Sequence, residues 1–466
     1  MKSKLSLLLT MLMAGLWACQ PTNTTPPASV LTSEIKDFKS PEALIVHIEN
    51  GILDTLKSGM DEAQSLSLNL DKEIILNLQE GYQNSYIYLK PGDTLSLGQG
   101  AKGEVSLFAA EPRSKENQYL YDVAKTTMEA EKGFQLFQIA GQKVDSFLIS
   151  LDKKYESLEK LSAEIAADTE ISDYFKKALA LRIKATKMKD KMMYESYYKY
   201  ITKEDAEVPE DFLAELDSKF YDDPLLLVFE EGRTMGGNLN GKNLNFEDME
   251  GAGAFFNALY AETDKDFQDP DLRSYFKSQA LEQQINFGSG LDGADELIAS
   301  FKTDVKNPYL LQKLEAVVKP WENIRKGMDA PDFSGVTRDG KMVKLSDLKG
   351  KSVYVDVWAT WCGPCIQEIP SLKQLEKDMH GRDVEFVSIS IDEQDSKQKW
   401  MDFVKKESLG GTQIMAENAW KSEVATSYNI QGIPRFLFID SEGKIISANA
   451  PRPSSSETKT LIESNS

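Results

Sequence analysis

The pattern of apolar and polar residues divides the chain into three regions that follow its N-terminal segment. Between about residues 31 and 110, apolar residues alternate with polar ones in short runs. Leu66-Ser67-Leu68-Asn69-Leu70 is one such run, and Pro91-Gly92-Asp93 is a turn sequence before the next one. Runs of period two with turns between them predict a small antiparallel β-domain, either a sandwich or a barrel.

The second region has the spacing of helices. Residues 113–208 contain no proline and are rich in Lys, Glu, Ala, Leu and Met, and their apolar residues recur at helical intervals. This pattern predicts long amphipathic helices. It continues more brokenly to about Lys319, and we interpret Pro224, the glycine-rich loop at 231–241 and Pro270 as interruptions. The middle of the chain is therefore predicted to be mainly α-helical.

In the last region, from about residue 326, strands alternate with helices. A hairpin is predicted to turn at Asp339-Gly340. The predicted strands are 353–358, 384–391, 435–439 and 444–448, and the predicted helices run from the cysteine motif to about 379, then over 396–407 and 420–428. This order of elements implies an α/β domain with a partly parallel central sheet.

The N-terminus has the features of an export signal. Lys2 and Lys4 precede an apolar stretch, residues 5–16, that is too short to span a bilayer and fits a secretory signal peptide. The stretch ends in Leu16-Trp17-Ala18-Cys19, which resembles the lipobox of bacterial lipoproteins and predicts lipidation of Cys19. An ordinary signal peptide that leaves a free thiol is the alternative.

These features predict five segments along the chain. They are a signal peptide (1–18), a polar, proline-bearing tether (19–30), a β-rich domain (31–110), a helical domain (111–325) and an α/β domain (326–466). The formal net charge of −20 argues against nucleic acids and anionic membrane surfaces as partners, because both attract patches of Lys and Arg.

The small number of cysteines limits the kinds of site that the cysteine motif can form. With Cys19 assigned to lipid, Cys362 and Cys365 remain, separated by two residues. A disulfide across so short a loop adds little stability, because it removes little chain entropy from the unfolded state. A zinc site needs two further ligands, but His47 and His380 lie far apart in sequence, so no metal site is predicted. A redox-active dithiol is the interpretation that remains.

The order of strand, cysteine motif and helix places Cys362 at a helix N-terminus. The unpaired N–H groups and the positive end of the helix dipole favour thiolate over thiol, so Cys362 is the predicted nucleophile. Cys365 lies one turn further on and can resolve the mixed disulfide that results. Pro364, next to Gly363, is pre-organised for a helix start, while Trp358 and Trp361 can shield the site and offer an apolar platform.

The motif WATWCGPC, with Ala330-Pro331-Asp332-Phe333 before it and Gly432-Ile433-Pro434 after it, resembles the membrane-tethered, thioredoxin-like disulfide reductases of the TlpA/ResA kind. The resemblance covers about residues 326–466 and implies a thioredoxin-like fold. It also implies that Pro434 is a cis-proline that faces the disulfide with Ile433 before it. From the residues alone, Ile433-Pro434 is equally a rigid turn before a strand.

Two carboxylates are candidates for proton transfer. Asp356 interrupts an apolar strand that should be buried on both faces, where a charge is costly unless it has a role. It matches the buried acid of thioredoxins, which takes the proton from the second cysteine. Glu368 lies three residues after Cys365, on the same helix face, and matches the active-site glutamate of the TlpA/ResA kind. The alternatives are a hydrogen-bonded structural Asp356 and a solvent-facing Glu368.

Together these features predict a thiol-disulfide oxidoreductase, favouring reduction, whose Cys362/Cys365 disulfide is its only redox group. The resemblance implies oxidised envelope proteins as substrates, apocytochrome c among them, and an inner-membrane thiol transporter as electron donor. A lipid anchor, with Gln20 after the cysteine favouring the outer membrane, would face the periplasm. The alternatives are an envelope binding lipoprotein with an accessory redox domain and a peroxiredoxin-like peroxidase, although the Pro/Thr/Cys peroxidatic motif is missing.

Overall fold

The computed structural model describes most of the chain beyond its N-terminal segment. It describes residues 29–33, 42–47, 51–57, 64–80, 83–97, 114–242, 244, 249 and 251–465. The predicted signal peptide, Cys19 and most of the tether lie outside the described residues, as does the side chain of His47. The chain forms two compact units, the first drawn from residues 1–47, 52–130 and 160–176 and the second from the remainder.

The β-strands of the first unit form two sheets. The strands are β1 (Ser29–Ser33), β2 (Glu42–His47), β3 (Gly51–Lys57), β4 (Gln64–Leu68), β5 (Ile74–Glu80), β6 (Gln83–Leu89) and β7 (Thr94–Leu97). One sheet has the order β4-β1-β7 and the other β3-β2-β5-β6. The pairs β1–β4, β2–β5 and β5–β6 are antiparallel, whereas β1 pairs with β7 in parallel. The predicted β-rich N-terminal region is confirmed.

A polar contact joins this β-structure to the helices of the same unit. The backbone N–H of Tyr88 donates to Asn117 Oδ1 over 2.8 Å, and Asn117 Nδ2 donates back to the carbonyl of Tyr88 over 3.0 Å. The ring of Tyr88 meets the edge of Phe175 at a centroid distance of 5.1 Å. The asparagine therefore continues the hydrogen-bond pattern of strand β6 onto a helix.

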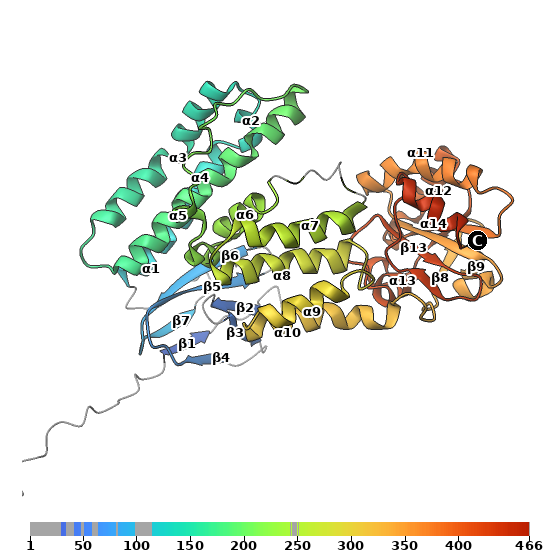
Figure 1. Cartoon of the computed structure of the whole chain (residues 1–466), viewed down its shortest axis with the longest axis horizontal. Coiled ribbons are helices and arrows are strands. Elements are labelled where there is room, and N and C mark those ends of the chain that lie inside the picture. Colours follow the sequence, from blue (N-terminus) through green and yellow to red (C-terminus); the bar gives the residue numbers. More distant parts are fainter. Residues whose placement is uncertain are drawn as a thin grey trace, which may run out of the picture. The chain divides into compact units, whose positions relative to one another are not determined.

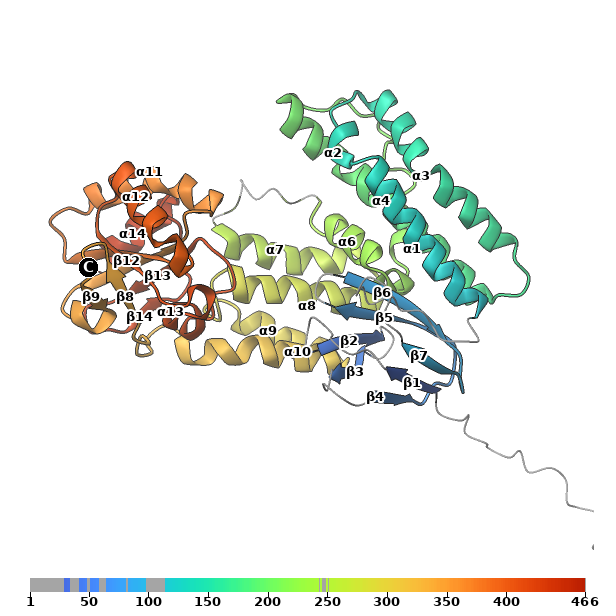
Figure 2. The ribbon, with the colours of Figure 1, turned by 180° about the vertical axis from the view of Figure 1, so that it is seen from behind.

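The middle of the chain is helical, as predicted. Its elements are α1 (Lys115–Gly133), α2 (Leu136–Ile139), α3 (Val144–Ala167), α4 (Asp173–Thr202), α5 (Ser218–Tyr221), η1 (Pro224–Val228), α6 (Glu230–Leu239), α7 (Gly251–Asp266), α8 (Pro270–Phe287), α9 (Asp295–Asp304), α10 (Pro308–Val318) and η3 (Lys319–Ile324). Pro224 and Pro270 begin helical elements, where the missing N–H of proline costs nothing. α7 and α8 run side by side (Figure 1, Figure 2).

The prediction of a glycine-rich loop at 231–241 is wrong, because most of this stretch forms helix α6. Its glycines serve close packing instead of a turn. A Cβ on Gly232 would lie 2.1 Å from the carbonyl oxygen of Leu226, and one on Gly236 would lie 2.4 Å from Phe276 Cζ. Glycine content alone could not distinguish a loop from a helix whose neighbours approach its backbone.

The C-terminal part of the second unit is an α/β domain. Its elements are β8 (Ser334–Thr337), β9 (Met342–Lys344), η4 (Leu345–Leu348), β10 (Ser352–Trp358), α11 (Gly363–Asp378), β11 (Val384–Ser390), η5 (Gln394–Ser396), α12 (Lys397–Glu407), β12 (Thr412–Met415), η6 (Ala419–Lys421), α13 (Glu423–Ser427), β13 (Arg435–Ile439), β14 (Ile445–Ser447) and α14 (Ser456–Glu463). The sheet order is β14-β13-β10-β11-β12-β8-β9, with β10, β11 and β12 parallel. The predicted α/β class and the partly parallel sheet are confirmed.

Helices cover both faces of this sheet. On one face, Tyr354 of β10 packs in a core with Leu372 of α11 and Ile462 of α14. On the other face, Val355 lies in a core that includes Trp400 of α12 and Val424 of α13. The second core continues into the preceding helices, since Leu281 and Trp321 belong to it. The α/β domain and the end of the helical region therefore share one apolar core within the second unit.

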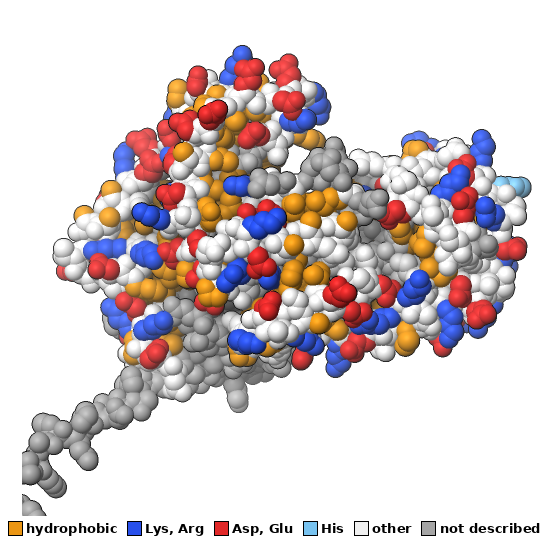
Figure 3. Space-filling model, viewed as in Figure 1, with side chains coloured by type: hydrophobic (Ala, Val, Ile, Leu, Met, Phe, Trp, Pro, Cys, Tyr) orange, Lys and Arg blue, Asp and Glu red, His pale blue; other side chains and the backbone are white. Residues whose placement is uncertain are grey.

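The acidic charge of the protein is dispersed over the surface that can be seen. Asp and Glu side chains alternate with Lys and Arg across the face in Figure 3, without one acidic patch. The chain has 74 acidic and 54 basic residues, and this distribution indicates that the excess of acidic residues serves to keep the surface solvated. Within the described ranges, none of the helices combines the length and the apolar character that crossing a bilayer requires.

The close approach at Gly232 predicts that alanine has opposite effects on stability at two glycines of helix α6. Gly232→Ala should lower the free energy of unfolding by ~2 kcal/mol, because its methyl group meets a backbone carbonyl that cannot move away easily. Gly237→Ala is the control, since that position is exposed with open space around it, and alanine should stabilise the helix by about 0.5–1 kcal/mol there. Urea unfolding followed by circular dichroism measures both. Equal midpoints for the two variants would contradict the packing role.

Candidate redox site

Strand β10 carries the redox motif to its position. Its sequence Ser-Val-Tyr-Val-Asp-Val-Trp is buried at every residue except Asp356, which is partly exposed. β10 pairs in parallel with β11 and antiparallel with β13, so its backbone is bonded on both sides. A strand paired on both sides and covered on both faces has little freedom, and it ends directly before the cysteine motif.

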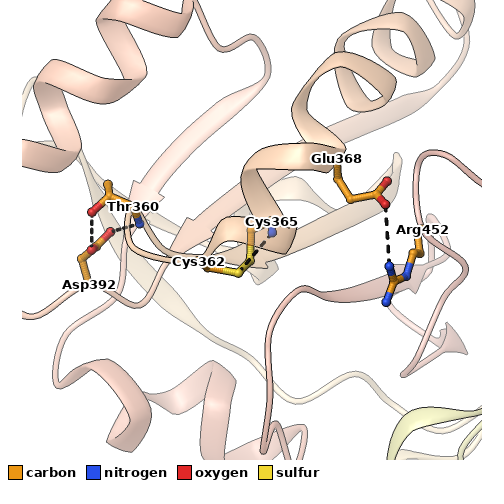
Figure 4. The surroundings of a disulfide bond; sticks show 6 residues. All are labelled: Thr360, Cys362, Cys365, Glu368, Asp392 and Arg452. Carbon is orange, nitrogen blue, oxygen red and sulfur yellow. Dashed lines mark hydrogen bonds and ion pairs between the residues drawn. A yellow bond between two sulfur atoms is a disulfide. The ribbon is translucent and has the colours of Figure 1, made fainter. Parts of the chain in front are cut away.

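The two cysteines lie at the beginning of helix α11. Cys362 is the N-cap residue, and its Sγ accepts a hydrogen bond from the backbone N–H of Cys365 over 3.1 Å. A disulfide joins the two, with 5.3 Å between their Cα atoms (Figure 4). Gly363 and Pro364 between them are exposed, whereas each cysteine is only 4% exposed. The first sulfur therefore lies where a helix stabilises negative charge.

A buried carboxylate that the sequence analysis missed holds the loop before Cys362. Asp392, 1% exposed, accepts a hydrogen bond from the N–H of Thr360 over 2.9 Å and another from its hydroxyl over 2.7 Å. The hydroxyl of Ser390 donates to the same carboxylate over 2.7 Å. This network fixes the loop between β10 and α11 (Figure 4). An acidic residue directly after a buried strand, at Ser390-Ile391-Asp392, was the available signal.

The two predicted flanking tryptophans occupy different environments. Trp358 is buried and packs against Phe403 of α12, with 5.5 Å between ring centroids. Trp361 is 54% exposed, and its ring centroid lies 6.3 Å from that of Trp420, which is itself 40% exposed. Trp358 is thus part of the core beneath the motif, while Trp361 and Trp420 place aromatic surface next to Cys362.

The bond between Ile433 and Pro434 is cis in this structure. Val357 of β10 pairs with Arg435 of the antiparallel strand β13. Continuing that register by one residue places Pro434 beside Trp358, at the end of β10 from which the motif begins. The structure thus brings Pro434 and Ile433 to the same end of the sheet as the two cysteines.

Asp356 has an altered acidity. Burial raises the pKa of its carboxyl group to about 7, the negative charge of Glu368 contributes in the same direction, and a hydrogen bond with Ser388 opposes both. Asp356 lies on the sheet face that α11 and α14 cover, the same face as Tyr354. A carboxyl group that titrates near neutral pH can both accept and release a proton there.

Glu368 is buried, at 8% exposure, and engaged with a different part of the chain. Its Oε2 accepts a hydrogen bond from the backbone N–H of Ser454 over 3.0 Å, and its Oε1 accepts one from the Ser454 hydroxyl over 2.9 Å. Arg452 Nη1 lies 3.9 Å from Oε1. In Figure 4 the carboxylate points away from the disulfide towards Arg452. Glu368 therefore ties α11 to the segment between β14 and α14.

Across the ranges that the structure describes, His, Cys, Asp and Glu side chains form no group of three or more that could hold a metal ion. Arg435, directly after Pro434, is buried, and burial lowers its pKa to about 10, so it remains charged at neutral pH. The chemistry that the geometry supports is exchange between a dithiol and a disulfide.

Comparison with known proteins also indicates a protein that exchanges thiols and disulfides. A family model described as Redoxin matches residues 325–462. The thiol-disulfide oxidoreductase ResA of Bacillus subtilis is 33% identical over 131 residues, which cover 28% of this chain and 70% of the relative. The ResA protein of Bacillus thuringiensis is 32% identical over 125 residues, covering 27% and 69%. The thioredoxin domain of a Bacteroides vulgatus thiol-disulfide oxidoreductase is 26% identical, with a TM-score of 0.28 and coverage of 30% and 96%.

A cysteine pair at the start of a helix and a cis-proline at the same end of a partly parallel sheet define an oxidoreductase with a thioredoxin-like fold. Within that class, the chain belongs to the ResA-like family of thiol-disulfide oxidoreductases. The resemblance that the motifs indicated is thereby confirmed. The identified relatives match less than a third of this chain, so the preceding helices and sheets are additional to the shared domain.

The acidity of Asp356 predicts a stability that depends on pH. An unfolded aspartate loses its proton near 3.8, whereas folded Asp356 keeps its proton up to about pH 7. The free energy of unfolding should therefore decrease as pH rises through this window and become constant above it. Asp356→Asn should remove that decrease and be more stable than the parent at pH 8 by on the order of 2 kcal/mol, since the partial exposure of Asp356 moderates the effect.

Chemical denaturation between about pH 3 and 8, bracketing the two proton-release values, measures this difference. Asp402→Asn is the matched control, because Asp402 lies on the exposed side of α12. The Asp356 variant and the parent should converge near pH 3, where the carboxyl group is protonated in both the folded and the unfolded state. A constant difference at all pH values would show that Asp356 does not titrate in this window.

Proposed function

We propose that this protein reduces disulfide bonds of proteins in the bacterial cell envelope. The observation that carries the proposal is the position of Cys362, whose sulfur caps helix α11 and accepts the Cys365 N–H. In the reduced protein this arrangement stabilises a thiolate at Cys362, and a thiolate is the attacking species in disulfide exchange. Membership of the ResA-like family supports the same reaction class.

The proposed reaction has two exchange steps. The Cys362 thiolate attacks one sulfur of the substrate disulfide, forms a mixed disulfide and releases the other substrate sulfur as a thiolate. Cys365 then attacks Cys362, closing the intramolecular disulfide and releasing the second substrate sulfur. Two electrons pass from the dithiol to the substrate, and a second dithiol protein must return them. An inner-membrane thiol transporter is the proposed donor.

Asp356 is the proposed acceptor for the proton that Cys365 loses in the second step. Its pKa of about 7 lets it take up and release a proton at neutral pH. The position of Glu368, three residues after Cys365 on the same helix, predicts the same task for it. Its hydrogen bonds to Ser454 favour an indirect contribution, through its charge near Asp356, over direct contact with a sulfur.

The two cysteines should behave differently when each is replaced. Cys365→Ser keeps the attacking thiolate but lacks the resolving one, so it should accumulate mixed disulfides with envelope proteins at roughly tenfold or more the level of Cys362→Ser. Non-reducing electrophoresis after acid quenching measures the trapped species, and the double variant is the control. Equal trapping by the two single variants would refute the assigned roles.

The proposed location rests on the N-terminal sequence. Cleavage before Cys19 and lipidation of that cysteine would anchor the protein to a membrane facing the periplasm, with Gln20 favouring the outer one. Cys19→Ala should shift most of the protein from the membrane fraction to the soluble fraction of a bacterial host, because the lipid on Cys19 is the proposed anchor. Immunoblots of fractionated cells measure this. Unchanged membrane recovery would exclude lipid as the anchor.

A further inference from the structure

The end of helix α8 is fastened to the redox domain on both sides of Phe287. Before it, the carbonyl oxygen of Asn286 accepts a hydrogen bond from Arg435 Nη2 over 2.7 Å. The guanidinium of Arg435 also lies over the Trp321 ring, 5.4 Å from its centroid. After Phe287, the side-chain amide of Asn449 donates to the carbonyl oxygen of Gly288. These bonds fix the backbone at Phe287 relative to strand β13.

Between these two fastened neighbours, the ring of Phe287 remains 43% exposed. It lies against the cis-proline loop, because a Cβ built on Gly432 would be 3.4 Å from Phe287 Cε1. Gly432 precedes the cis bond between Ile433 and Pro434. The ring of Phe287 is thus partly accessible and lies beside the loop that carries the cis-proline.

Phe287 forms one side of a pocket with a volume of about 560 Å³. Its other walls are the start of α7 at Gly253 and Ala254, the loop with Pro434, and the segment from Asn449 to Glu457. Glu368 holds this last segment through Ser454, so the pocket wall is tied to the helix that begins at Cys362. The pocket thus extends from the loop that carries the cis-proline to the helical region.

We propose that this pocket binds the polypeptide segment next to the cysteine of a substrate disulfide, with an apolar or aromatic side chain against Phe287. The proposal rests on the proposed function and extends it to a substrate class. The volume of the pocket is large enough for a few residues of a polypeptide chain. Ser289 and Asn449, which line the pocket, can bond the peptide groups of that segment.

The wall formed by Phe287 lies outside the domain shared with the relatives, since the Redoxin match begins at residue 325. The helical region would therefore contribute substrate selection that the redox domain alone does not provide. Phe287 acts in this proposal as a specificity-determining residue, while the exchange chemistry belongs to Cys362 and Cys365.

Selectivity between two peptide substrates tests the pocket. Each short peptide carries one cysteine in a disulfide with 2-nitro-5-thiobenzoate, flanked in one peptide by phenylalanine and in the other by glycine. In a single turnover, the reduced full-length protein should release the chromophore from the phenylalanine peptide with a second-order rate constant about fivefold to tenfold higher, as expected for one buried aromatic contact. Phe287→Ala should bring this ratio close to one, and Phe287→Tyr should preserve it.

Ala254→Trp gives an independent test, because it fills the pocket from the opposite wall and should also reduce the ratio. Ala261→Trp is the matched control: Ala261 is exposed two turns further along α7, is not part of the pocket, and should leave the ratio unchanged. Circular dichroism and thermal melting verify that the variants fold. No preference in the parent, or a preference that survives both Phe287→Ala and Ala254→Trp, would overturn the proposal.

The same chromophore linked to 2-mercaptoethanol separates this proposal from the proposed function. Release from this small disulfide by the parent, without peptide selectivity, would refute the pocket alone. Absence of release from any of the three disulfides would refute the reductase function and the pocket with it.

Discussion

The double pairing of strand β10 is the constraint on which the redox site depends. Its backbone is bonded to β11 on one side and to β13 on the other, and apolar cores cover both of its faces. The strand cannot shift by a residue without moving Val353, Val355 and Val357 to the wrong face. The strand therefore determines the positions of the groups at its end. These are the loop that Asp392 holds, Cys362 at the start of α11, and Pro434 opposite the last residue of the strand.

The same strand contains the residue that fits this environment least. Asp356 lies among apolar side chains, and the resulting rise of its pKa to about 7 means that its ionisation opposes folding at neutral pH. Glu368 adds to this cost by placing a second carboxylate nearby. Glu368 is itself stabilised by two hydrogen bonds from Ser454. The protein thus maintains two acids of different character close together, one that titrates near neutral pH and one fixed by hydrogen bonds, which is a common property of sites that transfer protons.

The sequence predicted the parts of the structure that short-range rules determine. The helix after the cysteine motif, the buried strand before it, the hairpin at Asp339-Gly340 and the partly parallel sheet all follow from periodicity and turn residues. The glycines of α6 were misinterpreted because their reason is a carbonyl group and an aromatic ring from elsewhere in the fold. Asp392 was missed for the same cause: its partner Thr360 is thirty-two residues away in sequence. Phe287 lies further still from the motif, so no local pattern marks it.

The buried arginine after the cis-proline explains how distant segments can act on one site. Arg435 is the first residue of strand β13, and its side chain donates a hydrogen bond to the carbonyl of Asn286 and covers the ring of Trp321, both from the helical region. A buried charge is costly unless its partners are held in place, so these contacts and the shared apolar core favour one arrangement of α8 against β13. Any group at the end of α8 is then fixed relative to Pro434. A helical region attached in this way can shape the substrate pocket without taking part in the exchange of electrons.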